Sequence, residues 1–115
     1  MMYLGKPVVA TGWSGNMDFM TNENSMPVRY ELKPLEFDQG AYPAGPLWAE
    51  ADIDHAAWCL EQLVEDSELG RRLGKRAQND VRRQLSPAVV GRQIQRRLRM
   101  LRHWYPDLID SVKKI

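Results

Sequence analysis

The sequence predicts an α/β fold in which two or three short strands are followed by three or four helices. A β-branched apolar run bounded by glycines, Lys6 to Thr11, is typical of a fully buried strand in a parallel sheet. From Asp52 onward, apolar residues recur at helical spacing. The chain has 115 residues, of which 43% are hydrophobic and 27% charged. We therefore expect a single domain over 1–115, with strands and loops in 1–50 and helices in 51–105.

The elements of the first part are short. After the first strand comes a glycine-rich turn, Gly12 to Asn16, which leads into one or two helical turns at 16–20. A second strand is expected over 26–30, where Pro27 favours a sheet edge or a strand start. Residues 34–48 are rich in proline and glycine, which predicts an extended surface loop that ends in Leu47-Trp48-Ala49-Glu50.

Three helices follow, and each carries one apolar stripe. Their N-caps are expected at Asp52 or Asp54, at Ser67 and at Ser86, with Pro87 in the first position of the third helix. We expect the third stripe to pack inward and its helix to end at Tyr105-Pro106. The stripes consist of Ile53, Ala57, Leu60 and Val64; of Leu69, Leu73, Ala77 and Val81; and of Val90, Ile94, Leu98, Leu101 and Tyr105.

Charge is distributed unevenly along the chain. The net charge is +1, but residues 1–69 hold three Lys and Arg against twelve Asp and Glu, whereas residues 70–115 hold thirteen against three. Such a split predicts that the two halves face each other or face different partners. It argues against a nucleic-acid binder, which would be basic throughout and would interleave aromatic residues with its arginines.

Several common kinds of site are not predicted. The sequence has neither an apolar run long enough to span a bilayer nor a signal peptide, so we expect a cytoplasmic protein. The single Cys59 cannot form an intramolecular disulfide and is expected to be a reduced, buried helix residue. His55 and His103 lack partners at metal-ligand spacing, so no metal site is predicted.

Two further groups of residues could be catalytic or metal-binding, but in each case the sequence favours a purely structural role. Ser14 and His55 could belong to a nucleophilic triad, but Gly-Trp-Ser-Gly lacks the five-residue spacing of a nucleophile elbow. Glu50, Asp52 and Asp54 could bind a cation, yet their position at a helix start favours capping.

The turn from Gly12 to Asn16 permits two interpretations. Backbone N–H groups at a turn that leads into a helix can hold anionic oxygens. The turn lacks both the dinucleotide fingerprint and the Lys-Ser/Thr ending of a P-loop. It could equally be a tight turn that needs glycine for its backbone angles.

Two stretches carry a resemblance to a known family: Leu4-Gly5-Lys6-Pro7-Val8-Val9-Ala10-Thr11 and Ser14-Gly15-Asn16-Met17-Asp18-Phe19. They resemble the C-terminal domain of retaining, nucleotide-sugar-dependent glycosyltransferases of the two-Rossmann (GT-B) architecture, which include many bacterial mannosyl- and glucosyltransferases. A later stretch also looks like one bacterial branch of these enzymes, with Ala51 where proline is frequent. Its matching residues are Tyr42-Pro43, Gly45, Trp48-Ala49-Glu50, Asp52 and His55-Ala56-Ala57. The resemblance extends to about residue 95.

The resemblance implies a partial Rossmann-like fold and a part in transferring a hexose from a nucleotide sugar to a glycan or lipid-linked acceptor, without a cofactor. The family's donor site depends on two glutamates separated by seven residues, and the second would precede Met1. The chain therefore resembles the last quarter to third of such an enzyme. We expect it to be inactive alone, and to associate with the missing N-terminal part of the enzyme or to form a homo-oligomer.

Ligands of open α/β sheets bind beyond the carboxyl ends of the strands, so the resemblance places the turn at the border of the donor cleft. No residue of this chain is expected to be catalytic. An alternative from another class is a non-catalytic interaction module, or a remnant, that completes a partner's fold. The expected border residues are Thr11, Gly12, Ser14, Gly15 and Asn16.

The basic helices indicate a second partner. Residues 70–102 hold eleven Lys and Arg against one acid, and Arg92, Arg96 and Arg99 share one helix face at i, i+4 and i+7. Such a surface could hold the protein at anionic lipid on the inner face of a membrane. The competing interpretation is a solvated helix face.

Overall fold

The computed structural model describes residues 1–37, 40 and 43–105. The chain divides into two compact units, Met1–Val81 and Arg82–Ile115. Tyr42, within the stretch that resembles the bacterial branch, and Pro106, expected at the end of the third helix, lie outside the described residues. The described elements mix short strands with helices, so the α/β class is confirmed.

The first sheet confirms the predicted parallel strand. β1 (Val9–Thr11) pairs in parallel with β2 (Met26–Val28), and the 3-10 helix η2 (Ser14–Asp18) lies between them in the chain. The Gly12 N–H donates to the Val28 carbonyl at 2.8 Å, which extends the pairing by one residue. Every residue of β1 is half-buried, so the expectation of a fully buried strand is wrong. Only β2 pairs with β1 among the described strands.

The second sheet is a hairpin that was not predicted. β3 (Tyr30–Pro34) and β4 (Leu47–Ala51) pair antiparallel, from Tyr30 opposite Ala51 to Pro34 opposite Leu47. The expected loop is therefore bounded by paired strands. Tyr30-Glu31-Leu32-Lys33 alternates apolar and polar residues as a strand does, although exposed residues predominate on both strands.

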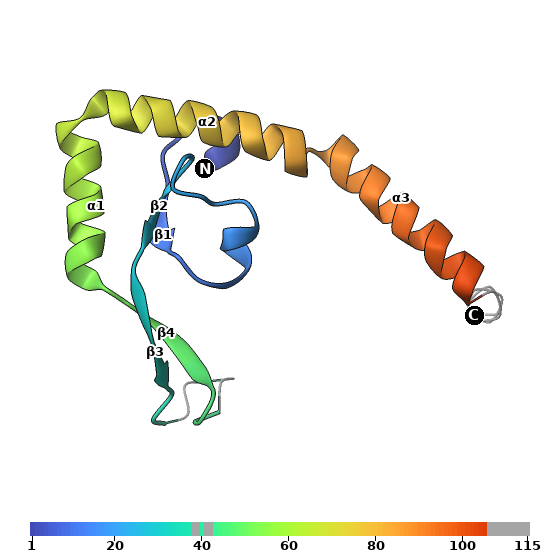
Figure 1. Cartoon of the computed structure of the whole chain (residues 1–115), viewed down its shortest axis with the longest axis horizontal. Coiled ribbons are helices and arrows are strands. Elements are labelled where there is room, and N and C mark those ends of the chain that lie inside the picture. The colour runs from blue at the N-terminus through green and yellow to red at the C-terminus, as the bar shows by residue number, and fades with distance from the viewer. Residues whose placement is uncertain (38–39, 41–42, 106–115) are drawn as a thin grey trace. The chain divides into compact units, whose positions relative to one another are not determined.

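The helix α1 (Ile53–Glu65) begins where expected, but the face that it buries is not the predicted one. Asp52 caps it, because its Oδ1 accepts the His55 N–H at 2.8 Å. The predicted stripe is exposed, with Val64 at 83%, whereas Cys59 is only 1% exposed. α1 contacts β1 and β2, and it lies beside these strands in Figure 1. The apolar stripe is thus not the buried face of this helix.

The helix α2 (Ser67–Leu85) buries its predicted stripe. Leu73 and Ala77 are buried. Its N-cap is Asp66 and not Ser67. The Asp66 carboxylate accepts the backbone N–H groups of Glu68 and Leu69, each at 2.9 Å. At Gly74 an added Cβ would lie 2.1 Å from the Gly5 carbonyl oxygen, so only glycine permits this approach of the two backbones.

The core of the first unit forms between α2 and the residues around β1. Its buried members are Met2, from the 3-10 helix η1 (Met2–Leu4), Met20 and Ala77. These side chains make one small apolar cluster with the half-buried residues around them. The half-buried members are Val8, Ala10, Phe19 and Val81.

A buried polar residue fixes the turn before β2. Asn24 is 2% exposed; its Oδ1 accepts the Thr21 N–H at 2.8 Å, and its Nδ2 donates to the Phe19 carbonyl and to Asp80 of α2, each at 3.1 Å. Asp80 also accepts from Arg76 Nε at 3.0 Å. This network joins the turn to α2.

The second unit contains α3 (Pro87–Trp104). The helix starts at Pro87 as expected, but the Ser86 side chain forms no capping hydrogen bond. Ile94 and Leu98 are 54% and 57% exposed, so the expected inward packing of their stripe is not found among the described residues. Within the described part of the chain, no helix has both the length and the apolar character that crossing a membrane requires.

Candidate functional site

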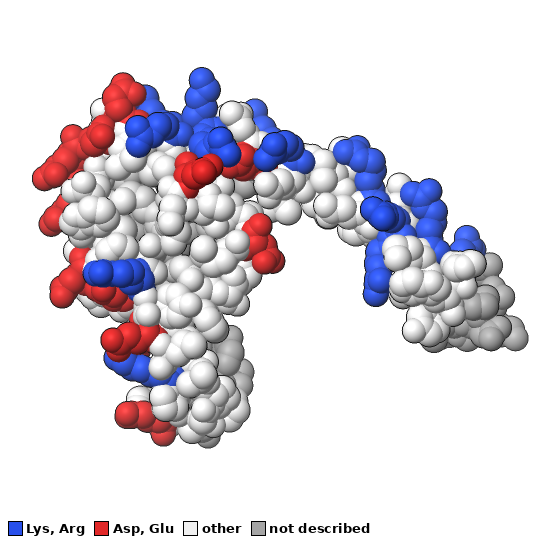
Figure 2. Space-filling model, in the orientation of Figure 1, with Lys and Arg blue, Asp and Glu red and all other residues white. Residues whose placement is uncertain are grey.

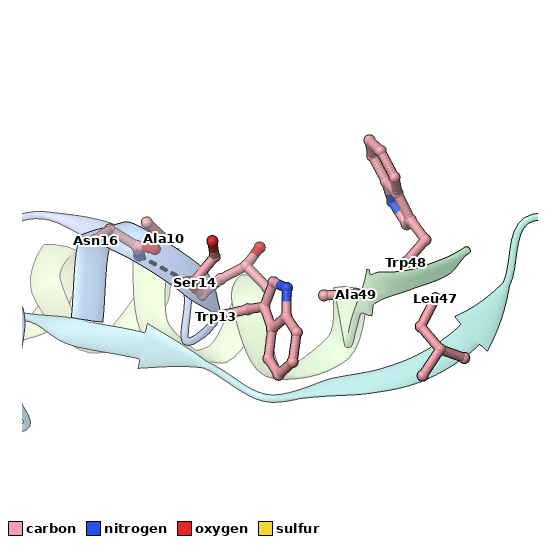
Figure 3. A pocket seen from close by; sticks show the side chains of 8 residues that line it. Ala10, Trp13, Ser14, Asn16, Leu47, Trp48 and Ala49 are labelled. Carbon is pink, nitrogen blue, oxygen red and sulfur yellow. Dashed lines mark hydrogen bonds between the residues drawn. The ribbon is translucent and has the colours of Figure 1, made fainter. Parts of the chain in front are cut away.

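A cavity of about 430 Å³ lies at the carboxyl end of β1 within the first unit. The turn after β1 forms one side and β4 the other, and Figure 3 shows the Ala49 methyl pointing toward the turn. Every side chain in its lining is uncharged. The lining residues are Ala10, Thr11, Trp13, Ser14, Asn16, Leu47, Trp48 and Ala49.

Hydrogen bonds within the turn hold it closed. The Thr11 carbonyl accepts both the Trp13 N–H and the Asn16 Nδ2, each at 2.8 Å, and the second bond is dashed in Figure 3. Ser14 has a φ of 68°, in the left-handed region that non-glycine residues rarely adopt. The chain therefore holds a serine at the cavity at some conformational cost.

The structure brings together three of the five predicted border residues. Thr11, Ser14 and Asn16 line the cavity, but Gly12 and Gly15 do not. A Cβ on Gly12 would lie 3.2 Å from the Pro27 Cβ, which supports the tight-turn interpretation for that glycine. Gly15 has nothing within 4 Å of its ideal Cβ, so packing does not demand glycine there.

The anion-binding interpretation loses its main support. η2 has five residues, which is too short for an appreciable helix dipole, and no cation lines the cavity. Sequence reasoning also missed the aromatic part of the site. Trp13 and Trp48 are 41% and 47% exposed, and both line the cavity although they are far apart in the sequence. Two exposed tryptophans, one after a strand end and one in a loop, were the available signal.

The candidate triad is not assembled at the cavity, because Ser14 lines it and His55 does not. His55 makes its hydrogen bonds at the start of α1 instead. Its Nδ1 accepts the Arg29 backbone N–H at 3.1 Å, and its own backbone N–H donates to the capping carboxylate of Asp52. That bond lowers the pKa of Asp52, and the Arg29 guanidinium 3.0 Å away lowers it further. Burial raises the pKa of the Cys59 thiol, so it is a poor nucleophile at neutral pH.

No metal centre is visible in the described part of the chain, where no three His, Cys, Asp or Glu side chains gather. Glu50, Asp52 and Asp54 therefore do not form the cation site that was considered for them. Asp52 caps α1, as its position at the helix start predicted.

The basic residues follow α2 and α3, as Figure 2 shows. Arg92, Arg96 and Arg99 all lie on α3 and are exposed. Two ion pairs of α2 link the acidic and the basic halves of the chain, Arg76 with Glu23 at 3.0 Å and Arg71 with Glu68. Contacts between the two halves therefore involve both Arg71 and Arg76 of α2.

Comparisons with protein-family models, with curated proteins and with solved structures find no match to this chain. Function is therefore inferred from the residues and from the geometry of the chain itself. The features that bear on function are the cavity at the end of β1, the exposed apolar stripe of α1 and the exposed face of α3.

Proposed function

We propose that this chain forms the C-terminal part of the donor-binding domain of a retaining glycosyltransferase with two Rossmann-like domains. The complete enzyme would transfer a hexose from a nucleotide sugar to a glycan or lipid-linked acceptor. One observation carries the proposal: the turn that resembles the family's motif follows a parallel strand and lines a cavity at its carboxyl end. Open α/β sheets bind their ligands at that place.

The open edge of the first sheet supports a larger domain. Parallel strands occur almost only in sheets with more strands and with cover on both faces. In the described residues, β1 has β2 as its one partner strand; α1 contacts both strands, and Ala10 packs against the cluster that contains Ala77 of α2. Further strands of a nucleotide-binding sheet would pair with β1 and bury it more deeply.

An exposed apolar stripe on α1 gives a second, independent support. Ile53, Leu60 and Val64 are all exposed on this one helix. Contiguous exposed apolar residues of this kind mark a contact surface more often than a solvated one. Additional polypeptide of the same enzyme would cover them.

In this proposal the chain binds and orients, and it supplies no catalytic group. Thr11, Ser14 and Asn16 border the cleft. The donor glutamates and the cations that hold the diphosphate belong to the preceding part of the enzyme. Positioning of this kind supplies much of a transferase's rate enhancement, so the isolated chain should be inactive.

The coding sequence upstream of Met1 tests the proposal. We expect an uninterrupted reading frame that encodes two glutamates separated by seven residues, the second close to Met1. A stop codon followed by an independent start at Met1 would contradict the proposal. It would favour the alternative, a non-catalytic module that completes a partner's fold.

We also propose an anionic membrane surface as the partner of α3. The observation that favours it is the exposure of Ile94 and Leu98 on a helix whose polar face is rich in arginine. Interfacial helices combine an apolar face that enters the lipid with basic residues that contact the headgroups. Many lipid-linked acceptors lie at such surfaces, which agrees with the proposed transfer.

A further inference from the structure

We propose that the exposed apolar stripe of α1 binds α3 of a second copy of this chain, and that α1 of the second copy binds α3 of the first. The proposed function places further polypeptide of the same enzyme over α1. The inference rests on the proposed function for that one point, and it names the polypeptide. The stripe consists of Ile53, Ala57, Leu60 and Val64, all of which are exposed.

Acidic side chains border the stripe of α1. Asp54 precedes Ala57 by three residues and Glu61 follows Ala57 by four, so both carboxylates lie beside Ala57 on the helix surface. Glu65 follows Glu61 by four residues and continues the acidic row. These three carboxylates are exposed, and none forms an ion pair within the described part of the chain. Because α1 has no Lys or Arg, its charge is wholly acidic.

α3 has the complementary surface. Its apolar stripe includes Ile94 and Leu98, which are 54% and 57% exposed. Arg97 follows Ile94 by three residues and Arg102 follows Leu98 by four, so both arginines border that stripe. The helix has five arginines and no Asp or Glu. Figure 2 shows acidic side chains along α1 and basic side chains along α3. Opposite charges beside two apolar stripes favour pairing of these helices.

The two stripes also match in length. Ile53 to Val64 and Val90 to Leu101 each cover eleven residue steps, or about 16 Å at 1.5 Å per residue. The two helices can therefore bury their stripes against each other along the whole of both. Such a contact removes apolar surface of α1 and of α3 from water, which is the main favourable contribution to association.

The helix between α1 and α3 favours a second copy as the partner. α2 has 19 residues and spans about 28 Å, and Ser86 is the one residue between α2 and α3. This length of helix separates α1 from α3 along one chain. Two copies related by a two-fold axis instead form the contact twice, because each chain supplies one α1 and one α3.

A second copy and a membrane would use the same stripe of α3. The pair of chains therefore forms where no lipid competes, and it is tested without lipid. Arg92 and Arg96 are each two residues from Ile94, so they point to the other side of the helix. The pair leaves these two arginines exposed.

Sedimentation equilibrium of the 115-residue chain tests the inference. We expect a reversible dimer that dissociates in the micromolar range, as small interfaces do. Leu60→Gln should weaken dimerisation by about tenfold or more, because each of the two contacts loses an apolar side chain. Leu47→Gln is the matched control: Leu47 of β4 is 62% exposed, close to the 55% of Leu60, and this variant should dimerise as the wild type does. Circular dichroism confirms that each variant is folded.

Exchanged charges show which helices meet. One variant has Glu61→Lys and Glu65→Lys, and the other has Arg97→Glu and Arg102→Glu. Each variant alone should be monomeric, because like charges would face each other in both contacts. An equimolar mixture should form a heterodimer, since opposite charges then meet in both contacts.

A second charge variant controls for net charge. Arg92→Glu with Arg96→Glu makes the same change of charge as Arg97→Glu with Arg102→Glu, but on the other side of α3. We expect it to dimerise within about threefold of the wild type, because these arginines do not border the stripe. The same loss of dimerisation in the two double variants would contradict the pairing of α1 with α3.

The inference and the proposed function fail separately. A wild-type chain that stays monomeric, an equal loss in Leu47→Gln and Leu60→Gln, or an exchanged-charge mixture that stays monomeric would overturn the pairing. An uninterrupted upstream reading frame with a monomeric chain would overturn the pairing and leave the proposed enzyme. A dimer with the expected variants, formed by a chain whose gene lacks the upstream glutamates, would support the pairing and contradict the proposed enzyme.

Discussion

α2 and α3 are basic amphipathic helices of 19 and 18 residues that use their apolar faces in different ways. α2 buries four residues, including Gly74 against the Gly5 backbone, whereas none of the residues of α3 is buried. In α3, no atom beyond the adjacent residues and the helix backbone lies within 4 Å of the ideal Cβ of Gly91. Small residues that permit close approach thus distinguish a helix that packs against its own chain from one whose faces remain exposed. Composition and charge alone do not.

The largest effect is expected where α2 meets the N-terminal segment. Gly74→Ala would place a methyl group 2.1 Å from the Gly5 carbonyl oxygen, so one backbone must move. We expect a loss of about 3 kcal/mol in the free energy of unfolding, or failure to fold. Urea denaturation followed by circular dichroism measures it. The matched variant Gly91→Ala in α3 should not lower the stability, because alanine favours a helix and meets no neighbour. Equal losses of stability in the two variants would contradict the proposed difference between α2 and α3.

The next effect concerns binding by α3. Replacing Arg92, Arg96 and Arg99 together by Gln should weaken binding to vesicles that contain anionic lipid by about two orders of magnitude, since each basic residue contributes about 1 kcal/mol. Binding should also fall as salt rises through the physiological range. Co-sedimentation with anionic and neutral vesicles at two salt concentrations is the measurement.

A control on α2 sharpens that test. Replacing Arg71, Arg72 and Lys75 by Gln removes the same charge from a helix whose apolar face is already buried. We expect a clearly smaller loss of vesicle binding. Equal binding of the wild type to neutral and anionic vesicles, or the same loss in both triple variants, would favour a solvated face on α3.

The buried network that joins α2 to the turn before β2 should matter less than Gly74. Asn24→Ala removes three hydrogen bonds of a side chain that is 2% exposed, to the Thr21 N–H, the Phe19 carbonyl and Asp80, so we expect a loss of about 2 kcal/mol. Thermal unfolding provides the measurement. The neighbouring Asn22 is exposed, and Asn22→Ala should change the stability by about 0.5 kcal/mol or less. A neutral Asn24→Ala would show that the network does not anchor α2.

The smallest effect is expected at the helix starts. Asp52→Ala removes a cap and an ion pair with Arg29, so the unfolding midpoint should fall, but by less than in Asn24→Ala. Ser86→Ala at the start of α3 should have no effect, because the Ser86 side chain forms no capping bond. The pKa of Asp52 is lower in the folded protein than in the unfolded chain. Its contribution is therefore complete at neutral pH and is lost as the pH falls through that lowered pKa. Asp52→Ala should flatten this acid limb of the stability profile.

The elements that were predicted best are those whose residue pattern fits only one kind of secondary structure. Leu69, Leu73, Ala77 and Val81 repeat every four residues beside two glycines, and α2 buries this face. β1 was recognisable from its glycine boundaries and β-branched residues, although its burial was overestimated. Pro87 likewise marked the start of α3.

The rest of the fold and of the site depends on tertiary contacts. α1 buries the side that contains Cys59, and its apolar stripe remains exposed, so periodicity indicated the wrong face. Tyr30-Glu31-Leu32-Lys33 of β3 alternates apolar and polar residues, but the proline-rich segment that follows favoured a loop, and the pairing with β4 was missed. The contribution of Leu47, Trp48 and Ala49 to the cavity depends on that hairpin. For this reason the sequence predicted the turn on one side of the cavity but not β4 on the other side.

Release of nucleoside diphosphate from a panel of nucleotide sugars tests the central claim most directly. The comparison is between the 115-residue chain and the same chain joined to the upstream sequence that its gene encodes. The account predicts release by the longer protein and no release by the chain alone above a heat-inactivated control. Release by the chain alone, or no release by the longer protein with any donor, would contradict it.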